Sequence, residues 1–258
     1  MKRSLFILLF LLGAKLFAQV SIDSFKRNSI QLIFGINQLK EENLHPKVHS
    51  GRVTGISYQH FLKSKNISDF DVTLKWSRAK TEYEDLSATA NAHITGSYSY
   101  LFKIINNPRI LYALGPEISI QYNLGFYPNW DESHLYWANH MDLGADNYLL
   151  YRVSKSGILL FNLGFSVFSV FNRPEYDRMY KIGTYSFEKV IHDLHSDYEF
   201  GSINKTIRMA FHMEYQFLLH PKFTQALCYS YEYLKINGNE SLPFQNNLHQ
   251  VGFKIYFK

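Results

Sequence analysis

Apolar and polar residues alternate along most of the chain. The clearest run covers residues 110–124, where one face holds Ile110, Tyr112, Leu114, Pro116, Ile118, Ile120, Tyr122 and Leu124. Side chains of a β-strand point to opposite faces in turn, so a period of two residues predicts a strand. This run is much longer than the usual globular strand of about five or six residues.

The same period recurs along the rest of the chain. It predicts strands at residues 29–38, 51–62, 69–80, 89–103, 109–126, 135–152, 157–171, 204–219, 222–236 and 247–258. The run 158–171 could also form a buried helix, but it is short for a membrane helix, and its Val, Phe and Ser content favours a strand. Its odd-numbered residues from Leu159 to Val167 are then predicted to face outward.

The connections between these strands alternate in length. Those after the second, fourth, sixth and eighth strands are short, and the others are longer. Short turns at one end and long loops at the other are typical of a transmembrane β-barrel. The pattern therefore predicts an all-β fold, an antiparallel up-and-down transmembrane barrel of about ten strands. A hairpin hidden in the longest connection, residues 172–203, would raise the count to twelve.

Alternation alone does not decide which face meets water. A soluble barrel buries its apolar face, whereas a membrane barrel turns that face to lipid and keeps a polar interior. Ionisable residues lie in the middle of the polar faces, at Glu117, Asp146, Glu214 and Lys254. Aromatic residues gather near the predicted strand ends, as at a membrane interface. We therefore favour the membrane barrel over a soluble β fold.

The first 18 residues resemble a secretory signal, with a basic start and an apolar run. We expect cleavage after Ala18, which leaves residues 19–258 as one barrel domain. Loss of Lys2, Arg3 and Lys15 lowers the formal net charge from +5 to +2, so the basic balance indicates no nucleic-acid partner. The one cysteine, Cys228, has no disulfide partner and is predicted to be an inert packed thiol.

The last strand carries a more specific pattern. Gln250, Gly252, Ile255 and Phe257 match in order the C-terminal signal of bacterial outer-membrane β-barrel proteins, which this chain resembles; Lys258 departs from it, because that signal usually ends on the aromatic residue. The resemblance implies the outer membrane of a diderm bacterium, with the barrel-assembly machinery and membrane lipid as partners. It implies no activity.

The predicted interior holds the candidate site residues, which are Glu117, His140, Asp142, Asp146, Arg208, His212 and Glu214. Our main interpretation is a network of ion pairs and hydrogen bonds, since buried charges need partners. The alternative is a rim-active, protease-like hydrolase using the pairs His140–Asp142 and His212–Glu214, each at a spacing that puts both side chains on one face. A barrel with such a rim site would resemble the omptin proteases. The paired aspartates of that family have no match in this sequence, so no catalytic residue is assigned.

The sequence supports neither a lipid hydrolase nor a metal site. No strand carries the His-X-Ser arrangement of outer-membrane lipid hydrolases, and no ligand spacing is typical of a metal site, so we predict neither metal nor cofactor. We expect a small, porin-like outer-membrane barrel without catalysis, which acts in envelope structure, binding or limited transport. The connection 172–203 is the segment expected to meet an extracellular ligand.

Overall fold

The computed structural model describes residues 25–43, 45–81, 89–128, 134–154, 157–174, 180–181, 186–220, 223–239 and 241–257. The predicted signal peptide, residues 1–18, lies outside this part of the chain, as does Lys258. No helix in these ranges is both long and apolar enough to cross a bilayer.

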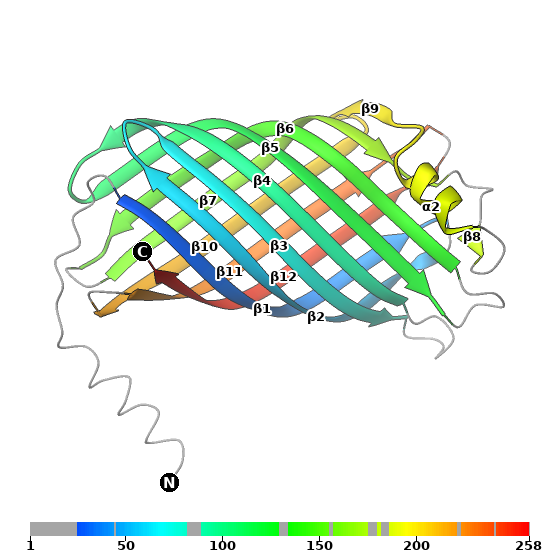
Figure 1. Cartoon of the computed structure of the whole chain (residues 1–258), viewed down its shortest axis with the longest axis horizontal. Coiled ribbons are helices and arrows are strands. Elements are labelled where there is room, and N and C mark those ends of the chain that lie inside the picture. Colours follow the sequence, from blue (N-terminus) through cyan, green and yellow to red (C-terminus); the bar gives the residue numbers. More distant parts are fainter. Residues whose placement is uncertain are drawn as a thin grey trace, which may run out of the picture.

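Ten long antiparallel strands form a closed barrel, in which they run strongly tilted to the long axis (Figure 1). They are β1 (Phe25–Glu41), β2 (His45–Lys63), β3 (Ile67–Lys80), β4 (Thr89–Asn106), β5 (Ile110–Tyr127), β6 (His134–Arg152), β7 (Gly157–Asn172), β10 (Thr206–His220), β11 (Phe223–Ile236) and β12 (Phe244–Phe257). The predicted ten-stranded barrel is confirmed. Closure pairs every strand edge along the wall. A barrel in lipid needs this, because lipid offers no hydrogen-bond partner to an unpaired edge.

The closing contact joins β12 to β1, with Ile255 opposite Ile30 and Gln250 opposite Gly35. Gly252 faces the lumen in this pair, and a Cβ atom there would lie 2.4 Å from Gln31 Nε2 and 2.8 Å from Leu32 O. The glycine therefore leaves room for the Gln31 side chain inside the wall. The final strand is a full member of the barrel, as its alternation predicts.

The longest connection, between β7 and β10, holds three short elements. They are β8 (Tyr180–Lys181), α2 (Phe187–Leu194) and β9 (Glu199–Ser202). β8 pairs with β6 and β9 pairs with β7, but they have only two and four residues. They extend the sheet above the barrel rather than crossing it, so the described residues of this connection form no hairpin that would raise the count to twelve spanning strands.

One irregularity shifts the predicted alternation of β7. Leu143 pairs with Phe168 and Gly144 with Ser166, which leaves Val167 as a bulge without a partner on β6. The predicted outward series from Leu159 is therefore interrupted at Val167, and the exposed Phe168 continues it. A β-bulge of this kind bends the strand and changes which side chains face the interior.

Large apolar side chains form a belt around the outside. On β1 the belt consists of Ile30, Leu32, Phe34 and Ile36, and β3, β5 and β12 add Phe70, Val72, Leu74, Trp76, Ile118, Ile120, Val251, Phe253 and Ile255. The inward residues between them are mostly polar, such as Ser29, Gln31 and Asn37 on β1. An apolar exterior around a polar interior is the arrangement of a transmembrane barrel.

Two clusters of buried apolar side chains lie inside the barrel, one near each end. Near the short turns the cluster consists of Phe61, Ile67, Leu101, Leu111, Ala113, Tyr148, Leu150, Ile158 and Leu160. Near the long loops it consists of Leu39, Ala138, Phe171, Leu234, Ile236 and Phe244. We call these the turn-end layer and the loop-end layer. The polar part of the lumen lies between them.

Candidate functional site

The lumen between the two layers holds a polar cavity of about 160 Å³. Its ionisable lining residues are Asp69, Asp71, Lys75, Glu117, Asp146, Arg208, His212, Glu232 and Lys254. They come from six strands, so the barrel wall brings together groups that are far apart in sequence. Such groups remain charged in a buried site only when other side chains compensate them.

Arg208 joins two carboxylates from other strands. Its Nη2 lies 3.1 Å from Glu117 Oε1 and its Nη1 lies 3.4 Å from Oε2, which is a bidentate contact. Its Nε lies 3.8 Å from Asp142 Oδ2. Gly164 makes the reach possible, because a Cβ atom there would lie 2.8 Å from Glu117 Oε2. Arg208 therefore neutralises much of the charge of Glu117 and Asp142 together.

His140 and Asp142 are brought together, with His140 Nε2 3.1 Å from Asp142 Oδ2. Asp142 also accepts hydrogen bonds from Ser119 Oγ, at 3.3 Å, and from Ser169 Oγ. Both members of the pair are almost completely buried in the wall of the lumen. The pair therefore does not lie open at the rim.

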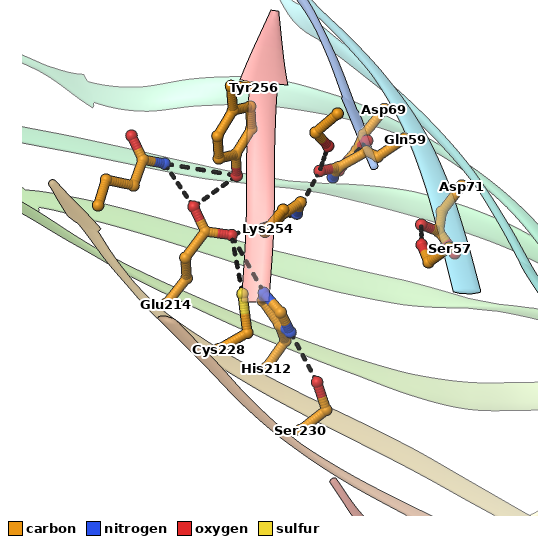
Figure 2. A network of polar contacts seen from close by, with 12 residues as sticks. Ser57, Gln59, Asp69, Asp71, His212, Glu214, Cys228, Ser230, Lys254 and Tyr256 are labelled. Carbon is orange, nitrogen blue, oxygen red and sulfur yellow. Dashed lines mark hydrogen bonds and ion pairs between the residues drawn. The ribbon is translucent and has the colours of Figure 1, made fainter. Parts of the chain in front are cut away.

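Glu214 is the centre of a second group, which Figure 2 shows. Lys254 Nζ donates to its Oε2 at 3.2 Å and also to Gln59 Oε1 at 2.6 Å. Two other donors reach the remaining oxygen, Oε1, namely Gln216 Nε2 at 2.7 Å and Tyr256 Oη at 2.5 Å. The fully buried carboxylate thus has donors on both oxygens.

His212 and Cys228 complete this group. His212 Nε2 lies 3.4 Å from Glu214 Oε2, and the Cys228 thiol donates to the same oxygen at 3.7 Å. The other ring nitrogen, His212 Nδ1, lies 2.8 Å from Ser230 Oγ. Cys228 is buried, as a packed thiol should be, but it packs against a carboxylate rather than in a purely apolar site.

The other acidic groups of the cavity rely largely on neutral donors. Asp69 accepts two hydrogen bonds from Gln59 Nε2, each at 2.8 Å, and Asp71 accepts one from Ser57 Oγ at 2.7 Å. Asp146, which the sequence placed on the inward face, accepts one from Asn162 Nδ2 at 2.8 Å. These amide and hydroxyl groups hold the carboxylates in place without cancelling their charge.

The two histidine–carboxylate pairs do not form one site. Asp142 lies opposite Ser169 on β7, whereas His212 lies opposite Asn162 on the same strand. Along β6, which has no bulge here, six residues separate Asp142 from Tyr148, the partner of Asn162. This is about 20 Å at about 3.3 Å per residue. The sequence predicts each pair correctly as neighbours, but a joint catalytic site would need them within hydrogen-bond reach of one substrate.

Several members of the lumen are not among the residues that the sequence singles out. Asp69 falls at the start of its run, and its spacing of two from Asp71, another cavity residue, is the one signal that places it on the inward face. Cys228 has no marker as a lone thiol, yet in the β10–β11 register it lies directly opposite Glu214. Lys75 and Glu232 are joined by a contact of 2.6 Å although they are 157 residues apart, which no local pattern reveals.

A buried arginine, Arg173, joins several chain segments at the loop end of the lumen. Arg173 Nη2 donates to Glu41 Oε1 at 2.6 Å, and its Nη1 donates to the carbonyl oxygen of Leu242 at 2.7 Å. The guanidinium carbon also lies 5.5 Å from the ring centre of Phe244. Arg173 therefore ties the connections that follow β1, β7 and β11 to one another above the loop-end layer.

The helix α2 lies on the outer wall, not over the mouth of the barrel (Figure 1). Its buried residue Leu194 packs against Trp137, which faces outward from β6. Asn139, the next outward residue of β6, donates from Nδ2 to the carbonyl oxygen of Leu194 at 3.3 Å. Below them on the same face lies Met141, an exposed residue of the belt. The helix thus sits directly above the lipid-facing belt.

Comparison with known proteins shows the fold but no family. The sequence matches no family model and no curated protein. The structure is similar to that of the outer membrane protease OmpT from Escherichia coli, at 8% identity and a TM-score of 0.50, over 95% of this chain and 99% of that one. It also matches the translocator domain of the autotransporter NalP from Neisseria meningitidis, at 9% identity and a TM-score of 0.45, over 100% and 95%.

By fold, the chain is therefore a closed antiparallel β-barrel of the type found in bacterial outer-membrane proteins. The closed ten-stranded sheet and the apolar belt support this independently of the comparison. At such low identity the likeness to a protease concerns the fold alone, and function has to be argued from this chain's own residues.

Proposed function

We propose that this protein is a non-conducting barrel that serves in envelope structure and binding rather than in transport or catalysis. The observation that carries the proposal is the filled lumen, with one apolar layer near each end and ion pairs between them. Every member of both layers is buried. An ion that crosses would have to displace packed apolar side chains, which expose no donors or acceptors to replace its hydration shell.

The first prediction concerns conductance. Folded protein inserted into a planar lipid bilayer is expected to give no single-channel steps, because the two layers interrupt any water path along the axis. Folding is checked first by heat-modifiable mobility on a gel, and insertion by protection of the barrel from protease in vesicles. Steps of constant size that grow with salt concentration would overturn the non-conducting function.

The hydrolase alternative has less support. His140 and Asp142 are enclosed by the wall, and His212 and Glu214 lie about 20 Å further along the strand direction. A hydrolase needs its base within reach of a substrate from outside. The inner groups are better explained as charges that compensate one another and hold the wall together.

We propose that outer-leaflet lipid contacts the segment between β7 and β10 through α2. Phe187 and Ile191 are one turn apart on the helix, with 79% and 42% of their surface exposed. Val190 and Leu194 belong to the same apolar side of the helix and pack on the wall. An amphipathic helix with exposed apolar residues directly above a lipid belt is placed to lie in the membrane interface.

The second prediction tests this contact. A Phe187→Trp variant in vesicles that contain brominated lipid is expected to show blue-shifted emission and strong quenching of the added fluorescence. Lys189→Trp on the same helix is the matched control, and its emission should be quenched less, because Lys189 lies on a different face of the helix from Phe187. Equal quenching at both positions, or none at Phe187→Trp, would contradict the interfacial position.

We also propose that residues 1–18 direct export and are removed, and that the barrel-assembly machinery inserts residues 19–258 into the outer membrane. The β12–β1 pairing supports this, since Gly252 and its neighbours form the closing strand that such a signal would occupy. Recovery of the mature protein from the soluble periplasm would contradict the location.

A further inference from the structure

Three side chains of the lumen, each able to bind a metal ion, lie within 4.8 Å of one another. His212 and Glu214 are two residues apart on β10, and Cys228 is the partner of Glu214 on β11. The group comes from two adjacent paired strands, so the sheet fixes its backbone positions. We propose that His212, Glu214 and Cys228 form a zinc-binding site in the wall of the lumen, with Nε2, Oε2 and Sγ as ligands.

Two of the three distances between the ligand atoms fit a tetrahedral zinc ion. Bond lengths of about 2.0–2.1 Å to nitrogen, 2.0–2.2 Å to oxygen and 2.3 Å to sulfur place nitrogen and oxygen about 3.4 Å apart, and sulfur and oxygen about 3.6 Å apart. The corresponding distances are 3.4 Å from His212 Nε2 to Glu214 Oε2 and 3.7 Å from Cys228 Sγ to the same oxygen. The third pair, His212 Nε2 and Cys228 Sγ, lies within 4.8 Å, whereas a tetrahedral zinc ion places these two atoms about 3.6 Å apart. Binding therefore leaves the two contacts of Glu214 almost unchanged and draws the imidazole and the thiol closer together.

The surrounding groups orient the ligands as in known metal sites, where the second nitrogen of a histidine is held by a hydrogen bond. Ser230 Oγ lies 2.8 Å from His212 Nδ1, so Nδ1 can donate to it while Nε2 keeps its lone pair for the metal. Gln216 and Tyr256 both donate to Glu214 Oε1 and leave Oε2 as the oxygen nearest the other two ligands (Figure 2).

The donor set selects the kind of metal. A thiolate, an imidazole and a carboxylate together suit zinc and exclude the hard cations magnesium and calcium, which prefer oxygen alone. Binding requires the thiol to release its proton to water, after which the carboxylate and thiolate balance the charge of the ion. His212 lines the cavity, so water can supply a fourth ligand there.

Lys254 is the competitor within the protein. Its ammonium group lies 3.2 Å from Glu214 Oε2 and so stands where a cation would approach. It also donates to Gln59 Oε1 at 2.6 Å, a contact that it can keep when it leaves Glu214. Removal of this positive charge should therefore tighten binding, whereas a purely structural cluster would only lose an ion pair.

The experiment uses the full mature barrel, folded in detergent, equilibrated with zinc and then dialysed. One zinc ion per chain is expected by elemental mass spectrometry. With cobalt(II) in place of zinc, an intense thiolate-to-cobalt absorption band in the near ultraviolet is expected, together with the visible bands of a tetrahedral ion. This band reports the Cys228 thiolate directly, because the chain has no other cysteine.

Variants separate this site from adventitious binding. Cys228→Ser should abolish the cobalt band and weaken zinc binding at least a hundredfold, and Ser230→Ala should weaken it about 10–100-fold. Lys254→Gln should tighten it at least tenfold. His140→Gln is the matched control, because it removes the other buried histidine–carboxylate pair, which has no thiol, and it should leave zinc binding unchanged.

Several results would overturn the site. Wild-type protein that is folded by gel mobility but retains no zinc would do so, as would zinc retained equally by Cys228→Ser. Weaker binding in Lys254→Gln would also contradict the competition. If Cys228→Ser fails to fold, Ser230→Ala decides, since it leaves all three ligands in place and should still weaken binding.

Discussion

Replacement of Arg208 by methionine is expected to destabilise the folded barrel by about 3–5 kcal/mol. Arg208 is the cation that contacts both Glu117 and Asp142, which are almost fully buried. Methionine keeps the apolar stem but leaves two carboxylates with less compensation, and an uncompensated buried charge costs more than the lost contact. Urea unfolding in lipid vesicles, followed by tryptophan fluorescence, measures the change.

Two controls identify the cause of this loss. Lys80→Met removes an exposed lysine of β3 that lies past the belt, in the same cross-strand row as Gln38, and should change stability by less than about 0.5 kcal/mol. Adding Glu117→Gln to Arg208→Met should recover a large part of the loss, because the neutral amide no longer needs a cation, while Asp142 keeps Ser119 and Ser169. A loss below about 1 kcal/mol in Arg208→Met would mean that water already compensates these carboxylates.

The barrel could be predicted because lipid imposes a strong and local pattern on each strand. Every second residue between Ile110 and Leu124 must be apolar when one face meets lipid, and that rule needs no knowledge of the rest of the chain. The closing strand was predictable for the same reason, with Val251 and Phe253 outward and Gln250 and Lys254 inward. Irregularities such as the bulge at Val167 and the register shift between Lys103 and Ile105 break the rule, and a single extra residue leaves no clear signal in the sequence.

The contacts within the lumen could not be predicted in the same way. The inward face of each strand was evident, but strand tilt and register decide which inward side chains meet across the barrel. Arg208 and Glu117 are 91 residues apart, and Gly164 on a third strand leaves the space in which they meet. The sequence therefore indicates which residues belong to the network, but not which of them contact one another.

The two apolar layers also leave a signal in the sequence. Along β5 the inward residues near the short turn are Leu111 and Ala113, and polar inward residues follow only from Glu117 onward. A barrel with an open water path needs polar inward residues near its ends as well as in its middle. An inward face that is apolar near the strand end and polar only further along the strand therefore predicts a closed lumen.

The position of α2 could not be predicted from the sequence, for a different reason. The sequence predicts that the connection 172–203 meets an extracellular ligand or holds a hairpin, and its charged composition fits both. The structure instead places Leu194 against Trp137, an outward residue of β6 that would otherwise be a large apolar side chain above the belt. This tertiary contact fixes the short helix on the wall, since isolated helices of this length are not stable in water.

The second large effect is expected from Leu32→Arg. Leu32 lies at the middle of the belt on β1, opposite Phe253 of β12, and 49% of its surface is exposed. Arginine at the bilayer midplane of a β-barrel costs about 2–4 kcal/mol, because its charge must leave water or draw water into the lipid. Urea unfolding in vesicles should therefore show a large loss of stability.

Gln38→Arg is the matched control on the same strand. Gln38 also faces outward, but it lies six residues nearer the loop end, past the belt, so its substitution should cost only about 0–1 kcal/mol. The comparison also separates a membrane barrel from a soluble one, in which both positions would be solvated surface and both changes would be nearly neutral. Equal, small losses at the two positions would contradict the lipid-facing belt, and with it the transmembrane orientation of every strand that shares this alternation.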